Sequence, residues 1–334
     1  RSRECAMQPI SLRQIETLQA IAREGTLHAA AGHLGMTPAA LTARVKALEE
    51  ALGLSLFDRT PAGLKLNMAG EVALAQARRI EGAVREFGEK MAAIRSGHGG
   101  RLSVAAVSTA KYFVPRLIAA YMQRHPGVDL RFVIGNRSET LASLRGYDVD
   151  VALTGRPPAD LAVNKLAIGP HPYVMIAPPF HPLVGQRRVP KEALAGEAFL
   201  FREEGSGSRS IFDYFIGDLA LRGAHGGIEL GSNETIKQAV MAGLGIALIS
   251  AHTIAAEVAD RRLVCLDVVG LPIIRQWYVV HRLDRDLSPT ARAFRSFVEQ
   301  RCAHFLPRLV SGTEPTTVLP PEIDDPQDDS GPDG

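Results

Sequence analysis

Cysteines and long apolar runs are scarce in this 334-residue sequence. Its three cysteines, Cys5, Cys265 and Cys302, stand far apart and lack metal-ligand spacing, which is typical of a protein kept in a reducing compartment. No run approaches the roughly 18 consecutive apolar residues that a membrane-spanning helix needs, and the first residues lack the apolar segment of a secretory signal. We therefore expect a cytoplasmic protein with no membrane partner.

Motifs of catalysis and of nucleotide binding are also missing. The ten histidines show no HExxH or comparable ligand spacing, and no Walker loop or GxGxxG motif follows a predicted strand. Residues 205–208 superficially resemble a nucleophile loop but lack the GxSxG elbow. These absences argue against an enzyme, and they predict no metal site and no bound cofactor.

The net charge of +2 hides an asymmetry along the chain. Residues 311–334 carry seven acidic groups and no basic one, which leaves +9 on residues 1–310. Because this end has almost no large apolar side chains after Leu319, it cannot bury enough surface to fold, and we expect a disordered acidic tail. The remaining chain, 46% hydrophobic and 22% charged over the whole sequence, is long enough for two or more domains. Residues 1–6 are left out of the fold prediction.

Residues 26–59 have the pattern of a helix-turn-helix. An alanine-rich helix is followed by a break at Gly35 and by a second helix, whose start is marked by Thr37 as N-cap and Pro38 as first helical residue. The second helix has one apolar stripe for a core: Leu41, Val45, Leu48 and Leu52. Its other side is small and nearly flat, as a helix entering a major groove must be: Ala39, Thr42, Ala43 and Lys46. This pattern predicts duplex DNA as a partner, with an ordinary three-helix packing unit as the alternative.

A hairpin is predicted directly after the helix pair. Two short apolar-alternating segments flank residues 61–63, and beside a helix-turn-helix such a hairpin is typical of a wing. Its arms carry Arg59 and Lys65, in position for phosphates or a minor groove, or simply as solvated surface charges. The predicted DNA-binding residues are Thr37, Pro38, Ala39, Thr42, Arg44, Lys46, Arg59 and Lys65.

A long helix is predicted over residues 68–96. Its apolar positions form a heptad-like seam: Ala73, Ala77, Ile80, Val84, Phe87, Met91 and Ile94. Charged residues lie on both sides of this seam. Burying the helix inside a globular domain would therefore remove these charges from water. We expect homodimerisation through this seam, because two helix-turn-helix units related by symmetry can then bind two DNA half-sites. The alternative is a helix that lies on the surface of its own chain.

From residue 101 the pattern changes to short buried-strand runs separated by helical stretches, which predicts an α/β region with a mainly parallel sheet, as one large domain or two lobes. Ligands in such sheets bind where strands lead into helices. Three such places offer hydroxyls and backbone N–H groups, after Val107, Phe201 and Leu230, and two of them add a cation. This chemistry suits an anion, although serine and threonine at helix starts are mostly plain N-caps. The predicted effector-binding residues are Ser108, Thr109, Ala110, Lys111, Asn136, Arg156, Glu203, Gly205, Ser206, Gly207, Ser208, Arg209, Asn233, Glu234 and Thr235.

The whole arrangement resembles the LysR-type transcriptional regulators. Residues 30–49 carry AAxxLxxTxxALTxxVxxLE, residues 52–59 carry LGxxLFxR, and the similarity extends from residue 10 to about 309. The resemblance implies a winged helix-turn-helix over residues 7–66, a linker helix that forms dimers over 67–96, and an effector domain over 97–310. This domain is expected to be like a type 2 periplasmic binding protein, with one lobe from 101–170 with 271–310 and the other from 171–270. It also implies a tetramer that bends promoter DNA and acts on RNA polymerase.

Within that family, the effector region is similar to the CbbR-type regulators, which activate Calvin–Benson–Bassham carbon-fixation operons. The similar stretches are residues 108–115, 155–158, 232–247 and 271–277. The resemblance implies a phosphorylated metabolite or NADPH as effector, in agreement with the anion-ready helix starts. Alternatives are a LysR-type regulator of another pathway with an organic-acid effector and, more remotely, a solute-binding or enzymatic α/β protein.

The DNA-binding region, residues 7–66, is called the head below. Its second helix departs from the family pattern in one place. Many members carry glutamine and arginine at positions occupied here by Pro38 and Ala43. Glutamine and arginine can form bidentate bonds to base edges, whereas proline and alanine offer only apolar contact. We therefore expect few base-specific contacts from Pro38 and Ala43 of this helix. More of the sequence recognition is then expected to depend on Thr42, Arg44, Lys46, the wing and DNA deformability.

Overall fold

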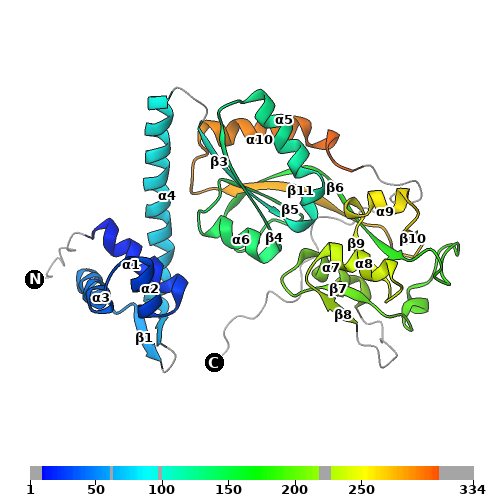
Figure 1. The fold of residues 1–334 in the computed structure, drawn as a ribbon, viewed down its shortest axis with the longest axis horizontal. Coiled ribbons are helices and arrows are strands. Elements are labelled where there is room, and N and C mark those ends of the chain that lie inside the picture. The colour runs from blue at the N-terminus through cyan, green and yellow to red at the C-terminus, as the bar shows by residue number, and fades with distance from the viewer. Residues whose placement is uncertain (1–9, 61–62, 97–99, 218–226, 308–334) are drawn as a thin grey trace, which may run out of the picture. The chain divides into compact units, whose positions relative to one another are not determined.

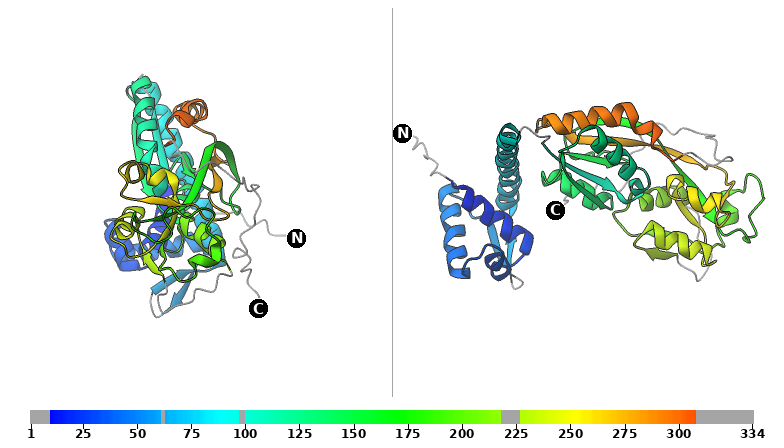
Figure 2. Two further views of the ribbon diagram at one scale, coloured as in Figure 1. Left: turned by 90° about the vertical axis from the view of Figure 1, so that its right-hand side faces the viewer. Right: turned by 45° about the horizontal axis from the view of Figure 1, so that its top comes forward.

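The computed structural model describes residues 10–60, 63–96, 100–217 and 227–307 (Figures 1 and 2). The chain divides near residue 97 into two compact units, each of which is described by itself. The predicted acidic tail at 311–334 and residues 1–6 lie outside the described residues. Across the described ranges, no helix combines the length and apolar character that crossing a bilayer requires.

The first unit opens with three helices: α1 (Leu12–Glu24), α2 (Leu27–His33) and α3 (Pro38–Leu52). Each begins at a side-chain N-cap, since the hydroxyls of Ser11, Thr26 and Thr37 accept the backbone N–H three residues ahead. The stripe predicted on α3 is confirmed, as Leu41, Val45 and Leu48 are buried among Leu18 and Ile21 of α1 and Ala30 of α2. The helix-turn-helix prediction is therefore confirmed.

The wing is confirmed as a two-stranded antiparallel hairpin, β1 (Phe57–Thr60) and β2 (Gly63–Leu66). Glu49 fixes where it starts, because its carboxylate accepts the backbone N–H of Leu56 at 2.7 Å and the hydroxyl of Ser55 at 3.1 Å. Gly70 fixes where it ends, because a Cβ there would lie 2.1 Å from the carbonyl oxygen of Leu56. The glycine is required by this close approach of two backbones.

Helix α4 (Met68–Ser96) is a single uninterrupted helix that leaves the three-helix head (Figure 2). The predicted seam is divided along its length. Ala73 and Ala77 pack against the core of the head, whereas Ile80, Val84, Phe87 and Met91 are 42 to 66% exposed. The side chain of Ile94 lies outside the described residues. The first two seam positions therefore belong to the head of the same chain, and the later ones present an uncovered apolar stripe.

The second unit is built on one seven-stranded sheet in the order β10, β6, β11, β5, β3, β4, with β9 beside β6. Its strands are β3 (Arg101–Val107), β4 (Asp129–Gly135), β5 (Val151–Thr154), β6 (Val163–Ala177), β9 (Ala247–Ser250), β10 (Val264–Leu266) and β11 (Ile273–Arg282). A separate parallel pair is formed by β7 (Leu200–Arg202) and β8 (Ile228–Leu230).

The prediction of a mainly parallel sheet is wrong. β3 pairs in parallel with β4 and β5, but β6 and β11 are antiparallel to each other and to their other neighbours β5, β9 and β10. The sequence misled because residues 171–177 of β6 are buried throughout. A strand buried on both faces shows no alternation, and continuous apolar runs of this kind are usual in parallel sheets.

Four hydrophobic clusters among the described residues lie along this sheet, two in each of two lobes. The helices are α5 (Val114–Arg124), α6 (Arg137–Arg145), α7 (Gly207–Ile216), α8 (Asn233–Met241), α9 (Ala255–Ala259) and α10 (Pro289–Arg301), with 3-10 turns η1 (Ser108–Tyr112), η2 (Lys191–Leu194), η3 (Ala251–Thr253) and η4 (Cys302–His304). In the first lobe, α5 and α10 cover one face of β3 and α6 covers the other (Figure 1). The second lobe contains β7–β10 and α7–α9, with its own core around Phe199 and Phe212. Strands β6 and β11 run through both lobes, which confirms the two-lobed architecture.

Candidate functional site

The predicted DNA-binding face of α3 is open to solvent. Exposed residues on it are Thr37, Pro38, Ala39, Thr42, Ala43 and Lys46, and Arg44 is half-buried. The hydroxyl of Thr37 accepts the backbone N–H of Ala40 at 3.2 Å, and the hydroxyl of Thr42 donates to the carbonyl of Pro38 at 2.9 Å. The hydroxyl proton of Thr42 is thus used by the helix itself, whereas Thr37 accepts and can still donate its proton, so the face offers a smooth surface with few donors.

Cations flank this face. The ammonium of Lys46 lies 3.6 Å from the carboxylate of Glu50, and both side chains are largely exposed. Such a pair is worth little and leaves Lys46 able to turn to a phosphate. On the wing, Lys65 is exposed and stands opposite Asp58 in the hairpin register. Arg59 lies on the other arm as predicted, and its side chain is outside the described residues.

In the second unit, the two lobes meet along an interlobe seam, formed by η1 and the start of α6 from the first lobe and by residues 202–207 and the start of α8 from the second. Arg202, at the end of β7, is 4% exposed and lies at the middle of the seam. Its guanidinium donates to both carboxylate oxygens of Glu203 at 2.6 and 2.7 Å and to Oδ1 of Asn233 at 2.9 Å. Across the seam it donates to the hydroxyl of Ser108 at 3.3 Å. A buried guanidinium with hydroxyl and amide neighbours is suited to a carboxylate or a phosphate.

A second contact across the seam involves Glu203 and the start of α6. Asn136 is hydrogen-bonded to Glu203, and the backbone N–H of Ser138 donates to the carbonyl of Gly205 at 3.2 Å. Burial is the largest single influence on Glu203 and raises its pKa, but the hydrogen bonds from Arg202, the backbone and Asn136, together with the charge of Arg202, hold the pKa below its usual value. Glu203 is therefore a carboxylate, and it occupies the guanidinium of Arg202.

A third contact is made by Glu234, at the start of α8. Its carboxylate accepts a hydrogen bond from the hydroxyl of Tyr112 and lies 3.5 Å from the ammonium of Lys111, both in the first lobe. It also lies 3.1 Å from the ammonium of Lys237, which is 3% exposed and pairs with Glu257 at 2.9 Å. Burial and the neighbouring carboxylate of Glu234 raise the pKa of Tyr112, so its hydroxyl remains a donor.

An aromatic stack lies where β6 and β11 pass from one lobe to the other. The rings of His171 and Trp277 stack 3.8 Å apart, and the indole N–H of Trp277 donates to Nδ1 of His252 at 3.1 Å. Nε2 of His171 is 2.9 Å from the hydroxyl of Ser250. Desolvation by burial lowers the pKa of His171 well below its usual range and that of His252 to about 4. Both imidazoles are therefore neutral, and the stack is buried where the two lobes are joined.

The structure gathers only part of the predicted effector residues at the seam. Those that take part in its contacts are Ser108, Lys111, Asn136, Glu203, Gly205, Asn233 and Glu234. The helix start predicted after Val107 is the 3-10 turn η1, and Ala110 within it belongs to the apolar core of the first lobe. Thr109, Ser206 and Ser208 are buried, and Ser208 is hydrogen-bonded to Tyr173. Gly207 begins α7, and Thr235 donates its backbone N–H to the cap Ser232.

Two predicted cations are placed differently. The guanidinium of Arg209 pairs with Asp213 at 2.9 Å and Glu229 at 3.1 Å and lies over the ring of Phe201. Because Phe201 and Arg202 are successive residues of one strand, they point to opposite faces, and Arg209 lies on the face away from the buried guanidinium. Arg156 is exposed, and its backbone N–H faces the hydroxyl of Thr154 at 3.5 Å.

Sequence reasoning missed several residues of the seam: Tyr112, His171, Arg202, Lys237, His252 and Trp277. Arg202 had a usable signal, since an arginine that ends an apolar strand in place of a core residue must be buried with partners or be exposed. Lys237 had a local signal only in Glu234, three positions before it, since its buried partners Thr253 and Glu257 lie 16 and 20 positions away. The aromatic stack had none, because Trp277 lies 106 positions from His171.

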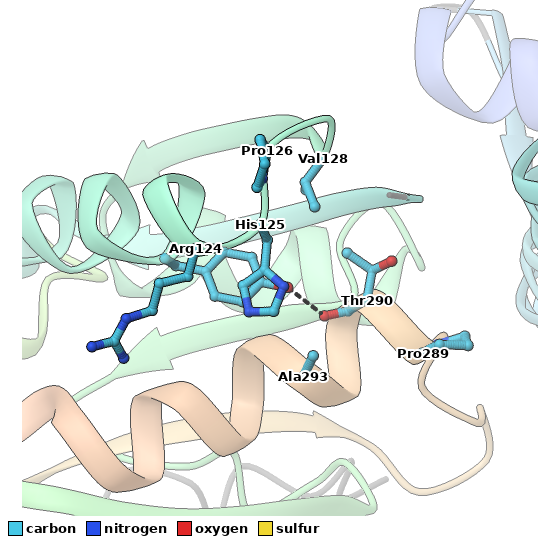
Figure 3. A pocket seen from close by; sticks show the side chains of 8 residues that line it. Arg124, His125, Pro126, Val128, Pro289, Thr290 and Ala293 are labelled. Carbon is cyan, nitrogen blue, oxygen red and sulfur yellow. Dashed lines mark hydrogen bonds between the residues drawn. The ribbon is translucent and has the colours of Figure 1, made fainter. Parts of the chain in front are cut away.

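A surface hollow of about 400 Å³ lies elsewhere in the first lobe, between the end of α5 and the start of α10 (Figure 3). Arg124, His125 and Thr290 are among its lining residues, and the hydroxyl of Tyr121 donates to the carbonyl of Thr290 across its wall. None of the predicted effector residues lines it. The seam and this hollow are therefore separate features.

A winged helix-turn-helix joined to a two-lobed domain with a buried guanidinium between its lobes defines a DNA-binding protein with a small-molecule domain. Comparison with known families shows which kind. Residues 12–71 match the family described as bacterial regulatory helix-turn-helix protein, lysR family, and residues 95–303 match the LysR substrate binding domain. The chain belongs to the LysR family of transcriptional regulators.

Several curated proteins are similar over nearly the whole chain. The HTH-type transcriptional regulator CbbR of Sinorhizobium medicae is 46% identical over 94% of this chain and 100% of its own length. CbbR of Xanthobacter flavus is 42% identical over 94% of both chains. The RuBisCO operon transcriptional regulator of Allochromatium vinosum is 41% identical over 90% of this chain and 99% of its own.

Solved structures agree with the fold. The CcmR regulatory domain of Synechocystis PCC6803, solved in complex with 2-PG, has a TM-score of 0.56 and 35% identity over 60% of this chain and 96% of that one. Full-length CbnR complexed with its target DNA has a TM-score of 0.59 over 87% of this chain and 99% of that one, at 22% identity. The second likeness concerns the fold alone.

Proposed function

We propose that this LysR-family protein regulates the transcription of carbon-fixation genes in response to an anionic, phosphorylated metabolite bound in the interlobe seam. The observation that carries the gene assignment is the 46% identity to a CbbR over that relative's full length. A relative named as a regulator of the RuBisCO operon supports the same genes.

The effector class follows from the chemistry of the seam. Arg202, Lys111 and Lys237 converge there with the hydroxyls of Ser108 and Tyr112. Charge-assisted bonds from such donors favour phosphate and carboxylate groups. The related CcmR regulatory domain, solved in complex with 2-PG, supports this class of ligand. NADPH is a further candidate because it is phosphorylated as well.

The proposed mechanism couples the two units through assembly. The exposed stripe of Ile80, Val84, Phe87 and Met91 on α4 pairs with that of a second copy, so that two heads bind promoter DNA, and dimers associate into tetramers. The effector binds one arrangement of the lobes more tightly than another, which changes DNA bending and the contact with RNA polymerase. Only such differential affinity can shift the balance between two arrangements.

Footprinting and gel-shift titration of the full chain test this function on DNA upstream of a Rubisco operon. We expect protection of an interrupted dyad and a shortened or shifted footprint with one of 2-PG, ribulose bisphosphate or NADPH. Affinity and footprint that stay unchanged with every metabolite contradict the effector part. Failure to protect this DNA at concentrations that protect another operon contradicts the gene assignment.

A further inference from the structure

The carboxylate of Glu234 occupies a position that is built for an anion. Three donors converge on it: the hydroxyl of Tyr112, the ammonium of Lys111 and the ammonium of Lys237. Two of these come from the first lobe and one from the second. Glu234 also lies in the first turn of α8, where the helix dipole favours negative charge. The chain therefore fills a ready anion position with its own side chain.

This carboxylate can leave at low cost. Its side chain is 46% exposed, so rotation carries it into water. Lys237 does not become an unpaired buried charge when it leaves, because Glu257 stays 2.9 Å away and the carbonyl of Thr253 accepts at 3.0 Å. Glu257 is the fixed counter-ion of Lys237, since its own side chain is only 11% exposed. Glu234 is the movable one.

The charges bonded to Arg202, Glu234 and Lys237 favour this exchange. Lys111, Arg202 and Lys237 are matched by three carboxylates, those of Glu203, Glu234 and Glu257. A phosphate dianion added to this neutral set leaves two uncompensated negative charges in a largely buried place, which is costly. The departure of one carboxylate halves that excess. Nearby, Nδ2 of Asn233 is buried and finds no hydrogen-bond partner among the described residues, which provides a donor for an arriving oxygen.

We propose that Glu234 is a displaceable internal counter-ion, which an anionic effector must replace on Tyr112, Lys111 and Lys237. The inference rests on the proposed effector binding and adds a rule of selection to it. A monocarboxylate that replaces Glu234 restores the same contacts and gains little. A phosphate brings a further charge and a third terminal oxygen, so the exchange selects phosphate over carboxylate.

Glu234→Gln tests the exchange, because it keeps the volume and removes the competing charge. Inorganic phosphate and acetate are titrated separately by calorimetry against the full chain. Removing a competing unit charge a few ångströms from the ligand strengthens phosphate binding by at least about tenfold, because the effective dielectric near a protein surface is lower than that of bulk water. Acetate meets the same competing carboxylate and gains by about the same factor. The preference for phosphate over acetate therefore does not increase in the variant.

Three further variants separate the exchange from other roles. Tyr112→Phe removes a donor used by both the carboxylate and the incoming anion, so phosphate affinity stays within about threefold of wild type. The double variant with Glu234→Gln shows less than the tenfold gain, because no carboxylate remains to be weakened and only the phosphate loses the donor. Glu234→Asp keeps the charge but shortens its reach, and it also binds phosphate more tightly. Glu299→Gln makes the same charge change at an exposed position on α10 and leaves phosphate affinity unchanged.

Glu234→Gln protein that binds phosphate no tighter than wild type overturns the exchange, and this includes the case in which neither binds. Thermal unfolding followed by the fluorescence of Trp277 shows whether the variant is folded, and Glu234→Asp gives a second reading if it is not. The proposed function fails on a separate measurement, the response of wild-type operator binding to metabolites. A wild-type protein that responds while Glu234→Gln shows no gain leaves the function standing and removes the exchange.

Discussion

The predicted DNA-binding face of α3 and the interlobe seam differ in exposure and in charge. The face of α3 is exposed, small and smooth, and the hydroxyls of Thr37 and Thr42 on it are engaged by its own backbone. The seam is dense with charge, largely buried, and closed by bonds between side chains of the two lobes, such as that from Arg202 to Ser108.

The two regions differ in how strongly their surfaces can discriminate between binding partners. A smooth helix face beside exposed cations lets the protein approach DNA by shape and charge, which carries little base-by-base information. A buried guanidinium with defined partners accepts only ligands that replace those partners, because an imperfect replacement leaves a buried charge unsatisfied. Under the proposed function, we therefore expect chemical selectivity to be concentrated in the second unit.

The largest effect is expected for Arg202→Met, which removes the buried guanidinium from the seam. Truncating one partner of a buried, hydrogen-bonded charge pair costs about 2 to 5 kcal/mol of binding free energy, so we expect metabolite affinity to fall at least about thirtyfold. Operator binding without metabolite should stay within about twofold of wild type, because the head keeps all its contacts. Gel-shift titrations with and without metabolite measure both quantities.

Arg209→Met is the matched control, since it removes a guanidinium of the same lobe that is paired with Asp213 and Glu229. It should leave the metabolite response in place. A metabolite response that survives in Arg202→Met, or one that disappears equally in Arg209→Met, would show that the seam is not the selective part.

How far the sequence could predict each region follows from the range of the interactions. In the head, caps, stripes and the wing depend on residues a few positions apart, such as Thr37 and Ala40 or Glu49 and Leu56, and the corresponding elements were predicted correctly. The long α4 helix was predicted to its last residue for the same reason. Its seam was partly misjudged, because whether Ala77 meets a second copy or the head of its own chain is a matter of tertiary packing.

In the seam, local patterns located the loops but not the groups that matter. The sequence indicated the loop after β7, yet it favoured Arg209 for the anion and left out Arg202. Which of two arginines in one loop faces the other lobe depends on strand alternation and on where η1 and α8 approach. The antiparallel course of β6 and β11 was missed as well, so the stack of His171 on Trp277 between the lobes could not be foreseen.

Lowering the pH should reduce the free energy of unfolding of the second unit, an effect smaller than that expected for Arg202→Met. The folded pKa of His252 is about 4 and that of His171 is also depressed, whereas unfolded imidazoles protonate near their usual 6.5. The unfolded chain therefore binds more protons as pH falls, and stability that is present above pH 6.5 is lost toward pH 4. Between pH 7.5 and 5, we expect the second unit to lose about 2 kcal/mol for His252 alone.

Urea unfolding followed by tryptophan fluorescence measures this loss, because Trp277 is the sole tryptophan and lies in the second unit. His252→Asn, which keeps an acceptor for the indole N–H, should reduce the loss. Amide hydrogen exchange resolved along the chain provides the comparison, since it reports the stability of the two units separately. Equal losses in both units, unchanged in His252→Asn, would refute this origin.

The smallest expected effect concerns the α3 face and tests whether its binding is indeed unselective. Lys46 is held only by an exposed pair with Glu50, so it is free to meet a phosphate. Lys46→Ala should weaken binding to operator and unrelated DNA alike, by a few fold, and reduce the salt slope by about 0.9 for each phosphate that is no longer neutralised. Glu50→Gln should act in the opposite direction, because it frees Lys46 and removes a charge that repels DNA. Binding measured against salt concentration on both DNAs decides the matter: a loss confined to one base pair of the operator would mean that Lys46 reads sequence, and that the head contributes more selectivity than its smooth surface implies.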